Sequence, residues 1–275
     1  MTTASLVNLG TVEYREAWDL QRSVAAGVAG GTLPDTVLLL EHPPTITLGR
    51  RTEPGELHVP AGADVAVVEV DRGGKSTYHG PGQLVCYPIL DLTRHGQDVK
   101  RYCRDLEEAL IRTLAAFGLD ATRIDGLTGV WLDRSAVPGV ALASGADGDS
   151  ASGTAPSVER SQRRERAAEA GSAGREPRAA GGGGPPRKIA SIGIHLTKWI
   201  STHGYALNVD LDPAPFTDWI TACGLEDAAF TTMARELGRA VGVDEVRPAA
   251  AAALADVFGF AFEERPAEAL LAPAA

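Results

Sequence analysis

The three cysteines of this sequence sit in different surroundings, and one is placed where a thiol could act as a nucleophile. Cys223 follows a short helical pattern in "TACGLED" and directly precedes a glycine, which predicts a loop, where functional side chains concentrate. Cys86 lies inside the apolar run "LVCYPIL" and Cys103 on the apolar stripe of a predicted helix, so both are predicted to be small core residues. Position alone leaves open whether Cys223 is functional or incidental.

A thiol reacts as its thiolate, so a catalytic Cys223 would need a nearby cation that lowers its pKa. Lys188 opens the apolar strand pattern "KIASIGIHLT" directly after a low-complexity segment, where its ammonium could face a cleft. Taken by position alone, this residue is better interpreted as an ordinary lysine at the end of a strand.

Two histidines stand beside glycines, His79 in "YHGPG" and His203 in "THGYA", and such glycines let another chain or a ligand approach closely. The sequence contains no HxxxH pair and no cluster of histidines with carboxylates, so a metal site is not expected. The other four histidines are predicted to serve turns, a polar loop or a strand: His42, His58, His95 and His195.

The stretch Asp71–Gln83, "DRGGKSTYHGPGQ", resembles the end of a phosphate-binding P-loop. That pattern requires a further glycine at position 69, where this chain has Glu69, a carboxylate that would repel a phosphate. The stretch is also followed by a Pro-Gly break and a strand pattern, whereas a P-loop opens a helix. The P-loop interpretation therefore fails, and the loop is expected to serve another purpose.

The composition narrows the class of protein. The chain has 275 residues and a formal net charge of −10, which argues against nonspecific binding to nucleic acid or to an anionic membrane. Three cysteines at no metal-like spacing fit a reducing cytosol. The first residues lack the basic start and apolar core of a signal peptide, and no apolar run approaches the roughly 20 residues of a membrane span. A cytoplasmic protein is expected.

Hydrophobic patterning predicts a mixed set of strands and helices. The predicted helices are 13–29, 98–117 with Asp98 as its cap, a short piece before Cys223, one from about 231 and one from 246 to 258. The predicted strands are 5–10, two around the Pro-Pro turn at 43–44, 65–70, 83–92, 127–133, and a hairpin of 188–197 with 202–209. The absence of a regular βαβ repeat favours an α+β fold with a mixed, largely antiparallel sheet and packed helices.

Residues 134–186 differ sharply in composition from the rest of the chain. They are mostly Gly, Ala, Ser, Arg, Glu and Pro, including "GSAGREPRAAGGGGPP". Such a segment buries too little apolar surface to offset its ordering entropy. Because strand patterns resume directly after it, it is predicted to be a disordered, dispensable insert within one catalytic domain, 1–275, rather than a linker between two domains.

Several segments together resemble one family, the octanoyl-[acyl-carrier-protein]:protein N-octanoyltransferases of the lipoyl/octanoyl transferase family (lipoate-protein ligase B type). They are "RGGKSTYHGPGQLVCYPILDL", "TGVWLD", "KIASIGIH", "HGYALNVDLD" and "CGLEDAAFTTMARELG". The resemblance implies a biotin/lipoate protein ligase-like fold and a cysteine–lysine pair, with Cys223 as the acyl-thioester nucleophile and Lys188 lowering its pKa. It thereby overturns the interpretation of Lys188 as an ordinary strand-end residue.

The same resemblance implies an acyl-substrate site and a set of partners. The donor would be octanoyl-acyl carrier protein, and the acceptors would be lipoyl domains of 2-oxoacid dehydrogenase E2 subunits and the glycine cleavage H protein, with no cofactor and no metal. Glycines of the 72–83 loop are expected to let backbone pass close to the acyl chain. The implied substrate contacts are Arg72, Gly73, Gly74, Lys75, Ser76, Thr77, Tyr78, His79, Ser191, Ile192, Gly193, His203, Gly204, Tyr205 and Ala206.

Two departures from the family pattern and two alternative functions remain. Ala222 replaces the proline that commonly precedes the nucleophile, and the long insert replaces a usually short connection.

An ATP-dependent lipoate or biotin protein ligase of the same fold is one alternative function, against which the failed P-loop and Cys223 both argue. A noncatalytic protein that binds acyl carrier protein is the other. Backbone N–H groups at Gly73–Gly74 or Cys223–Gly224 are the candidate oxyanion donors.

Overall fold

The computed structural model describes residues 2–132, 186–221 and 229–270 of the chain. Cys223 and the predicted insert at 134–186, apart from Pro186, lie outside these described residues. Everything below concerns the body formed by residues up to 134 and from 184 onward.

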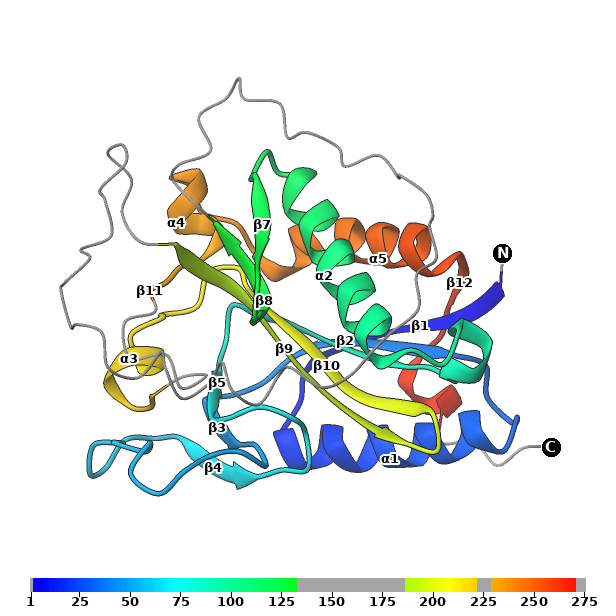
Figure 1. The fold of residues 1–275 in the computed structure, drawn as a ribbon, viewed down its shortest axis with the longest axis horizontal. Coiled ribbons are helices and arrows are strands. Elements are labelled where there is room, and N and C mark those ends of the chain that lie inside the picture. Colours follow the sequence, from blue (N-terminus) through cyan, green and yellow to red (C-terminus); the bar gives the residue numbers. More distant parts are fainter. Residues whose placement is uncertain (1, 133–185, 222–228, 271–275) are drawn as a thin grey trace, which may run out of the picture. The chain divides into compact units, whose positions relative to one another are not determined.

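Its main element is a nine-stranded sheet (Figure 1). Strands β12, β1 and β2 run parallel to one another, and from β2 onward the neighbours pair antiparallel, so the sheet is mixed and largely antiparallel, as predicted. In spatial order the strands are β12 (Phe260–Glu264), β1 (Thr2–Thr11), β2 (Thr36–Glu41), β6 (Gln83–Ile89), β10 (Ile200–Asn208), β9 (Arg187–Thr197), β8 (Leu127–Leu132) and β7 (Ala121–Ile124), with β11 (Ala229–Phe230) pairing beside β9.

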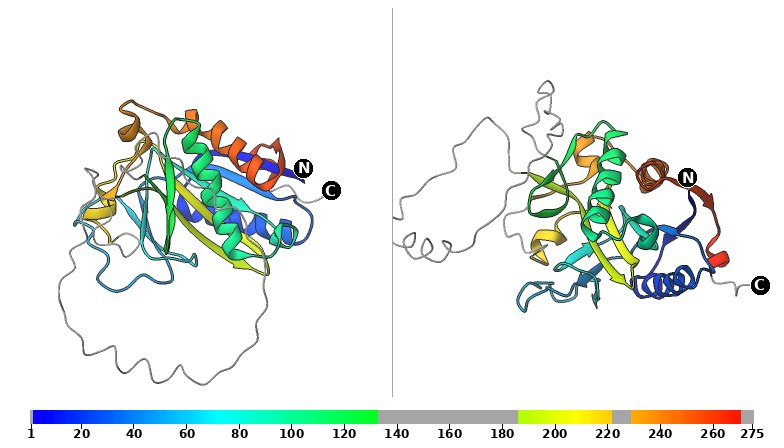
Figure 2. Two further views of the ribbon diagram at one scale, coloured as in Figure 1. Left: turned by 45° about the horizontal axis from the view of Figure 1, so that its top comes forward. Right: turned by 45° about the vertical axis from the view of Figure 1, so that its right-hand side comes forward.

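A smaller sheet and the helices complete the body. The order of the smaller sheet is β4 (Ala66–Glu69), β3 (Thr45–Leu48) and β5 (Thr77–His79). The helices are α1 (Tyr14–Ala29), α2 (Val99–Ala115), α3 (Pro215–Asp218), α4 (Met233–Leu237) and α5 (Val243–Phe258), with 3-10 turns η1 (Leu92–His95) and η3 (Ala267–Leu270). Figure 2 shows α2 and α5 beside each other and α1 apart from them.

The alternation of side chains along the strands divides the core into two layers. On β2, Leu39 packs with α2 and α5, whereas Leu38 and Leu40 pack with α1. On β6, Cys86 belongs to the first layer and its neighbours to the second, as the period of two requires. Both faces of the sheet are therefore apolar.

Helix α2 illustrates how the sequence pattern and the structure agree and differ. The Asp98 side chain accepts hydrogen bonds from the N–H groups of Lys100 and Arg101, a cap that contributes about 1 kcal/mol. Leucines 106, 110 and 114 are fully buried, as the stripe predicted. Val99, an apolar residue in the first turn, is 40% exposed.

Other differences concern short elements. Strands β5 and β7 were not predicted, since three or four residues carry too little periodicity to distinguish them from loops. The two strands around the Pro-Pro turn do not pair with each other but enter different sheets. Helix α5 begins at Val243, three residues before the predicted start, and contains Pro248 within its first turns.

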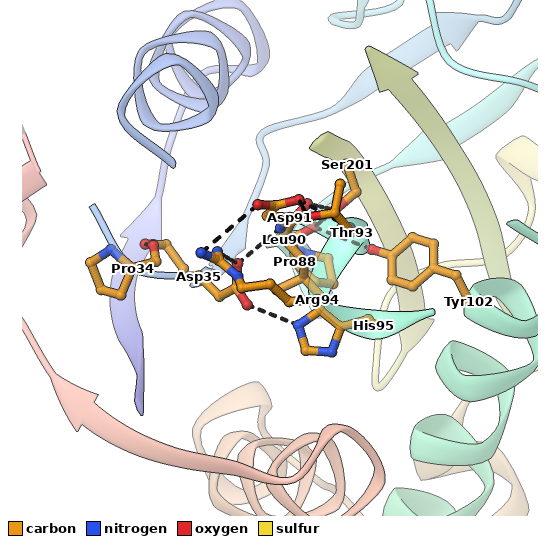
Figure 3. Close-up of polar contacts among 11 residues, drawn as sticks. Pro34, Asp35, Pro88, Leu90, Asp91, Thr93, Arg94, His95, Tyr102 and Ser201 are labelled. Atoms are coloured by element: carbon orange, nitrogen blue, oxygen red, sulfur yellow. Dashed lines mark hydrogen bonds and ion pairs between the residues drawn. The ribbon is translucent and has the colours of Figure 1, made fainter. Parts of the chain in front are cut away.

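A buried carboxylate joins the ends of two central strands (Figure 3). Asp35 precedes β2, and its side chain accepts hydrogen bonds from the Asp91 N–H at 2.9 Å, Arg94 Nη2 at 2.6 Å and His95 Nε2 at 2.8 Å, all from the segment that follows β6. Ser201 Oγ of β10 donates to Pro88 O near the end of β6 and accepts from the N–H of Leu90, which follows β6, so the ends of β2, β6 and β10 are fixed together.

Candidate active site

A cavity of about 810 Å³ is lined by strands of the main sheet and by residues of both α1 and α2, among them Tyr14 and Cys103. Strands β6, β10 and β9 form its floor, and the loop from Arg72 to Ser76 with β5 forms a wall. Of the residues implied as substrate contacts, all but Tyr78 line it, and Lys188 lines it as well. Three segments far apart in the sequence thus meet around one space, although what contact each makes with a substrate stays a prediction.

Tyr78 points away from the cavity because β5 alternates its faces. Its ring packs edge-on against Phe216 and Trp219, with ring centroids 5.7 and 5.9 Å away. Tyr78 belongs to the small core under the second sheet, and its predicted contact with the substrate stays a prediction.

Arg72 shapes the cavity wall from inside. Its guanidinium is buried and donates hydrogen bonds to Gly73 O at 3.0 Å, Lys75 O at 2.8 Å, and both Thr47 O and Thr47 Oγ1 at 3.0 and 2.7 Å. These bonds tie the loop to β3. Arg72 therefore holds the loop in shape, in addition to facing the cavity.

Several glycines of the site are required by close contacts within the protein. A Cβ on Gly193 would lie 3.0 Å from Arg72 Cδ, and one on Gly82 would lie 2.7 Å from Leu211 N. Gly82 is therefore also required by contacts within the protein itself. The Gly73 N–H donates to Ile194 O at 3.0 Å, so this candidate oxyanion donor already has a partner in the structure.

The Lys188 side chain is buried in a close-fitting space. The residue is only 3% exposed, and its Nζ lies 5.3 Å from the centroid of the Trp131 ring on the neighbouring strand. A Cβ on Gly129 would lie 2.9 Å from Lys188 Cε, and Gly129 has φ = +116°, a conformation that favours glycine. Gly129 and Trp131 were not predicted individually, although both belong to the quoted "TGVWLD" segment.

The chain on either side of the Cys223 segment is fixed beside this cavity. Thr221 N donates to Glu56 O at 3.0 Å, and Ser76 Oγ, on the cavity wall, donates to Thr221 O at 3.3 Å. On the far side, Thr231 N donates to Lys188 O at 3.0 Å. Cys223 itself lies outside the described residues.

Buried aromatic and histidine side chains form the inner wall. His42 Nδ1 lies 2.7 Å from Val12 O, which can only accept, so Nδ1 carries the proton and Nε2 accepts from the Tyr87 hydroxyl at 2.7 Å. Burial lowers the pKa of His42 to about 4, which keeps the ring neutral. The prediction that His42 merely serves a turn is wrong, since its ring is part of the support behind Tyr87, a cavity-lining residue.

His203 is held on this wall by three contacts. The backbone N–H of His203 donates to Gln21 Oε1 at 2.6 Å. In its ring, Nε2 donates to Asp71 Oδ1 at 2.8 Å, and Nδ1 lies 3.4 Å from the Tyr14 hydroxyl. Its φ is +57°, a conformation that costs about 1–3 kcal/mol outside glycine. The hydrogen bond from His203 is the main cause that lowers the pKa of Asp71, and burial lowers the pKa of His203.

Cys103 differs from its predicted place in the core. It is half-buried and lines the cavity from α2, while Cys86 is fully buried as expected. Burial raises the pKa of the Cys103 thiol, and Glu107 raises it further. This thiol is therefore held in its protonated, unreactive form at neutral pH.

The described residues contain neither a metal-binding cluster nor a helix that could span a membrane. Across 2–132, 186–221 and 229–270, no group of three or more His, Cys, Asp or Glu side chains is arranged to hold a metal ion. Among the helices of those same ranges, none combines the length and apolar character needed to cross a membrane.

Known proteins share both the sequence and the fold of this chain. Residues 13–255 match the family model "Lipoyl protein ligase A/B catalytic domain". The octanoyltransferase of Mycobacterium leprae is 43% identical over 256 residues, covering 93% of this chain and 88% of that protein, and the octanoyltransferase of Mycobacterium tuberculosis is 44% identical over 247 residues, covering 90% and 83%.

The solved structures resemble the fold at low sequence identity. A bipartite lipoate protein ligase from Thermoplasma acidophilum aligns with a TM-score of 0.62 at 14% identity, covering 98% of this chain and 91% of that one. A lipoate-protein ligase A bound with ATP aligns with a TM-score of 0.58 at 13% identity, covering 98% and 92%. The α+β, ligase-like fold expected from the sequence is thus confirmed. Given the family match and the identity to its curated members, the chain belongs to the octanoyltransferases of the lipoyl protein ligase A/B catalytic domain family.

Proposed function

We propose that this chain transfers an octanoyl group from octanoyl-acyl carrier protein to a lysine of a lipoyl domain, through a thioester on Cys223. One observation carries the assignment of the site: Lys188 lines the cavity, and Ser76 of the cavity wall is hydrogen-bonded to Thr221, two residues before Cys223. Thr221 precedes Cys223 by two residues, which span at most about 7 Å. The anchoring of Thr221 by Ser76 therefore supports a thiol that reaches the cavity wall.

The first half of the reaction forms the acyl-enzyme. The Cys223 thiolate attacks the thioester carbonyl carbon, a new carbon–sulfur bond forms, and the carrier thiolate leaves and takes up a proton. Lys188, held over the Trp131 ring, supplies the positive charge that favours the Cys223 thiolate. Because the Gly73 N–H is already bonded, the backbone N–H groups at Gly74 and Cys223–Gly224 remain as candidates for the oxyanion.

The second half forms the product. The neutral amine of the acceptor lysine attacks the enzyme thioester, an amide bond forms, the amine loses a proton, and the Cys223 thiolate is restored. An amide is more stable than a thioester, so the transfer needs no ATP. Lys188, which lines the cavity, gives its proton to the leaving carrier thiolate in the first half and so becomes a neutral amine; it can then accept the proton of the attacking amine, which restores the ammonium.

The apolar part of the cavity suits an eight-carbon chain. Its floor presents Val85, Ala206 and Ile192 to the space, and the Tyr87 ring stands at the inner wall. Burying the methylene groups contributes roughly 0.8 kcal/mol each, about 5 kcal/mol in all. Chain-length selection is therefore expected to arise from the depth of this space, because carbons beyond the inner wall gain no burial.

The acceptors are lipoyl domains of 2-oxoacid dehydrogenase E2 subunits and the glycine cleavage H protein. Family membership supports these acceptors. The Thermoplasma acidophilum ligase of similar fold is described together with its own E2 lipoyl domain. The reaction is expected in the cytoplasm, where the acyl carrier protein of fatty-acid synthesis would supply the donor.

A transfer assay without nucleotide tests the proposal. Purified protein mixed with octanoyl-acyl carrier protein and an apo lipoyl domain should octanoylate the acceptor in the absence of ATP and magnesium. Free octanoate with ATP should give no product. Transfer that depends on ATP and free octanoate would instead identify a ligase, and binding of the donor without any product would identify a noncatalytic binding protein.

A further inference from the structure

The residues that line the cavity carry charge of the opposite sign to the whole protein. The whole chain carries a formal net charge of −10. Among the residues that line the cavity, however, five are cationic and one, Glu53, is acidic. The five cations are Arg50, Arg51, Arg72, Lys75 and Lys188. A cationic cleft in an acidic protein concentrates anions at its mouth, so the reaction's donor is expected to bring negative charge there.

Three of these cations are already engaged within the protein. Lys188 is buried beside Trp131, and the guanidinium of Arg72 donates to the backbone and side chain of the wall. The ammonium of Lys75 forms ion pairs with Glu53 and Glu56, which neutralise it. These three side chains shape the cavity rather than offer charge to a ligand.

Arg50 and Arg51 are different. Both are exposed at the rim of the cavity, and neither forms an ion pair with a carboxylate of residues 2–132, 186–221 or 229–270. We call these two residues the arginine rim. Arginine presents a planar fork of donors that matches the oxygens of a phosphate, which makes two adjacent arginines a suitable phosphate site.

The backbone beneath the arginine rim is hydrogen-bonded to the neighbouring loop. Arg50 N donates to Arg72 O at 3.2 Å and Arg51 N to Gly74 O at 3.1 Å, so the rim is bonded to the loop that walls the cavity. A Cβ on Gly49 would lie only 2.5 Å from Gly74 O, so the two loops pack in direct contact. The two guanidinium groups therefore start from fixed Cα positions, which reduces the entropy lost when they bind an anion.

The proposed function supplies an anion at the right place. The octanoyl chain enters the cavity, so the rest of the donor, from the thioester sulfur outward, must leave across the rim. In an acyl carrier protein this outer part is a pantetheine arm joined to the protein by a phosphodiester. We propose, on the basis of the proposed function, that Arg50 and Arg51 bind the phosphate of this arm and so select phosphorylated octanoyl thioesters.

Two small donors that differ only in the phosphate test this directly. Octanoyl-pantetheine and octanoyl-phosphopantetheine are each mixed with the full-length protein, and the rate of octanoyl-enzyme formation is followed by intact-mass spectrometry at subsaturating donor. The wild-type protein should react about tenfold faster with the phosphorylated donor, as charge-assisted hydrogen bonds to one phosphate would give. That preference should shrink as potassium chloride is raised, because salt screens exposed charges.

The variants are Arg50→Gln, Arg51→Gln and the double variant, with Arg15→Gln as a matched control, since Arg15 is exposed on α1 and does not line the cavity. The double variant should lose the preference for the phosphorylated donor while its rate with octanoyl-pantetheine stays within about twofold of wild type. Arg15→Gln should keep the preference.

Other outcomes overturn the proposal. Equal loss with both small donors would mean that the arginines only support the fold of the rim. An unchanged preference in the double variant, with a lower rate only for octanoyl-acyl carrier protein, would mean that they contact the surface of the carrier protein instead. A wild-type protein that accepts octanoyl from none of the donors would remove the proposed function itself, a result distinct from loss of phosphate selection.

Discussion

The Lys188 side chain occupies space that is open only because Gly129 has no side chain: a Cβ on Gly129 would lie 2.9 Å from Lys188 Cε and 3.4 Å from its Nζ. The same Cβ would lie 2.5 Å from Ala190 O, so the position tolerates no side chain without movement of β9. A single glycine thereby decides where the ammonium of the proposed catalytic lysine can stand.

Gly129→Ala should therefore displace Lys188 as well as strain the backbone. Alanine at a positive φ costs about 1 kcal/mol or more, and the clash adds to it. The control is Gly126→Ala, because Gly126 has φ = +82° but nothing within 4 Å of its Cβ position. Urea unfolding and transfer rate should both fall more in Gly129→Ala than in Gly126→Ala. Equal effects of the two variants would show that the clash with Lys188 does not matter.

Replacing Lys188 itself tests its charge. Lys188→Met should move the midpoint of iodoacetamide labelling of Cys223 to higher pH by about one pH unit, because the cation that favours the thiolate is gone. Lys188→Arg keeps a charge and should restore labelling in part. It should not restore transfer if Lys188 also accepts a proton, since arginine does not readily lose one. An identical labelling profile in Lys188→Met and wild type would refute the pairing.

Asp35 should make stability depend on pH in a defined direction. Burial alone raises the pKa of this carboxyl, but the hydrogen bonds from His95, the Asp91 N–H and Arg94 outweigh burial, and the pKa lies below its ordinary value of 3.8. A carboxyl with a depressed folded-state pKa stabilises the fold fully above the unfolded-state pKa. That stabilisation is lost as the pH falls through the folded-state pKa.

Asp35→Asn should accordingly lower the free energy of unfolding by about 2 kcal/mol at pH 7, since it removes charge-assisted hydrogen bonds. The difference from wild type should shrink as the pH falls below about 4. Asp105→Asn serves as the control, because its carboxyl has a pKa raised by burial and forms only a surface ion pair with Arg101. A pH-independent difference for Asp35→Asn would contradict the linkage.

Removal of the insert is expected to be harmless. Leu132 at the end of β8 and Arg187 at the start of β9 are paired Cα partners, so the two ends of the insert meet across one ladder. Deleting residues 141–184 leaves a short connection, which costs no more closure entropy than the long one. Thermal unfolding and octanoyl transfer should stay close to wild type. A folded deletion variant without activity would mean that the insert takes part in substrate binding.

The sequence identified candidate site residues where these residues belong to long motifs. Lys188, the 72–79 loop and the 203–206 segment were identified from the sequence, and the structure brings them to one cavity. His42 was misassigned because its partners, Val12 and Tyr87, are 30 and 45 residues away, a distance over which local pattern says nothing. Asp35 was missed for the same reason, since Arg94 and His95 are 59 and 60 residues away. Tyr78 packs in the small core rather than in the cavity lining, because a motif match does not tell which face of a short strand a residue occupies.

Intact-mass spectrometry of the octanoyl-enzyme tests the central claim most directly. Mixed with octanoyl-acyl carrier protein, the wild-type protein should gain the mass of one octanoyl group, and Cys223→Ala should gain none. Cys103→Ala is the matched control, because Cys103 is a free thiol of the described residues that lines the cavity. This variant should keep the adduct. An adduct that persists in Cys223→Ala and disappears in Cys103→Ala would place the thioester on α2 and contradict the account.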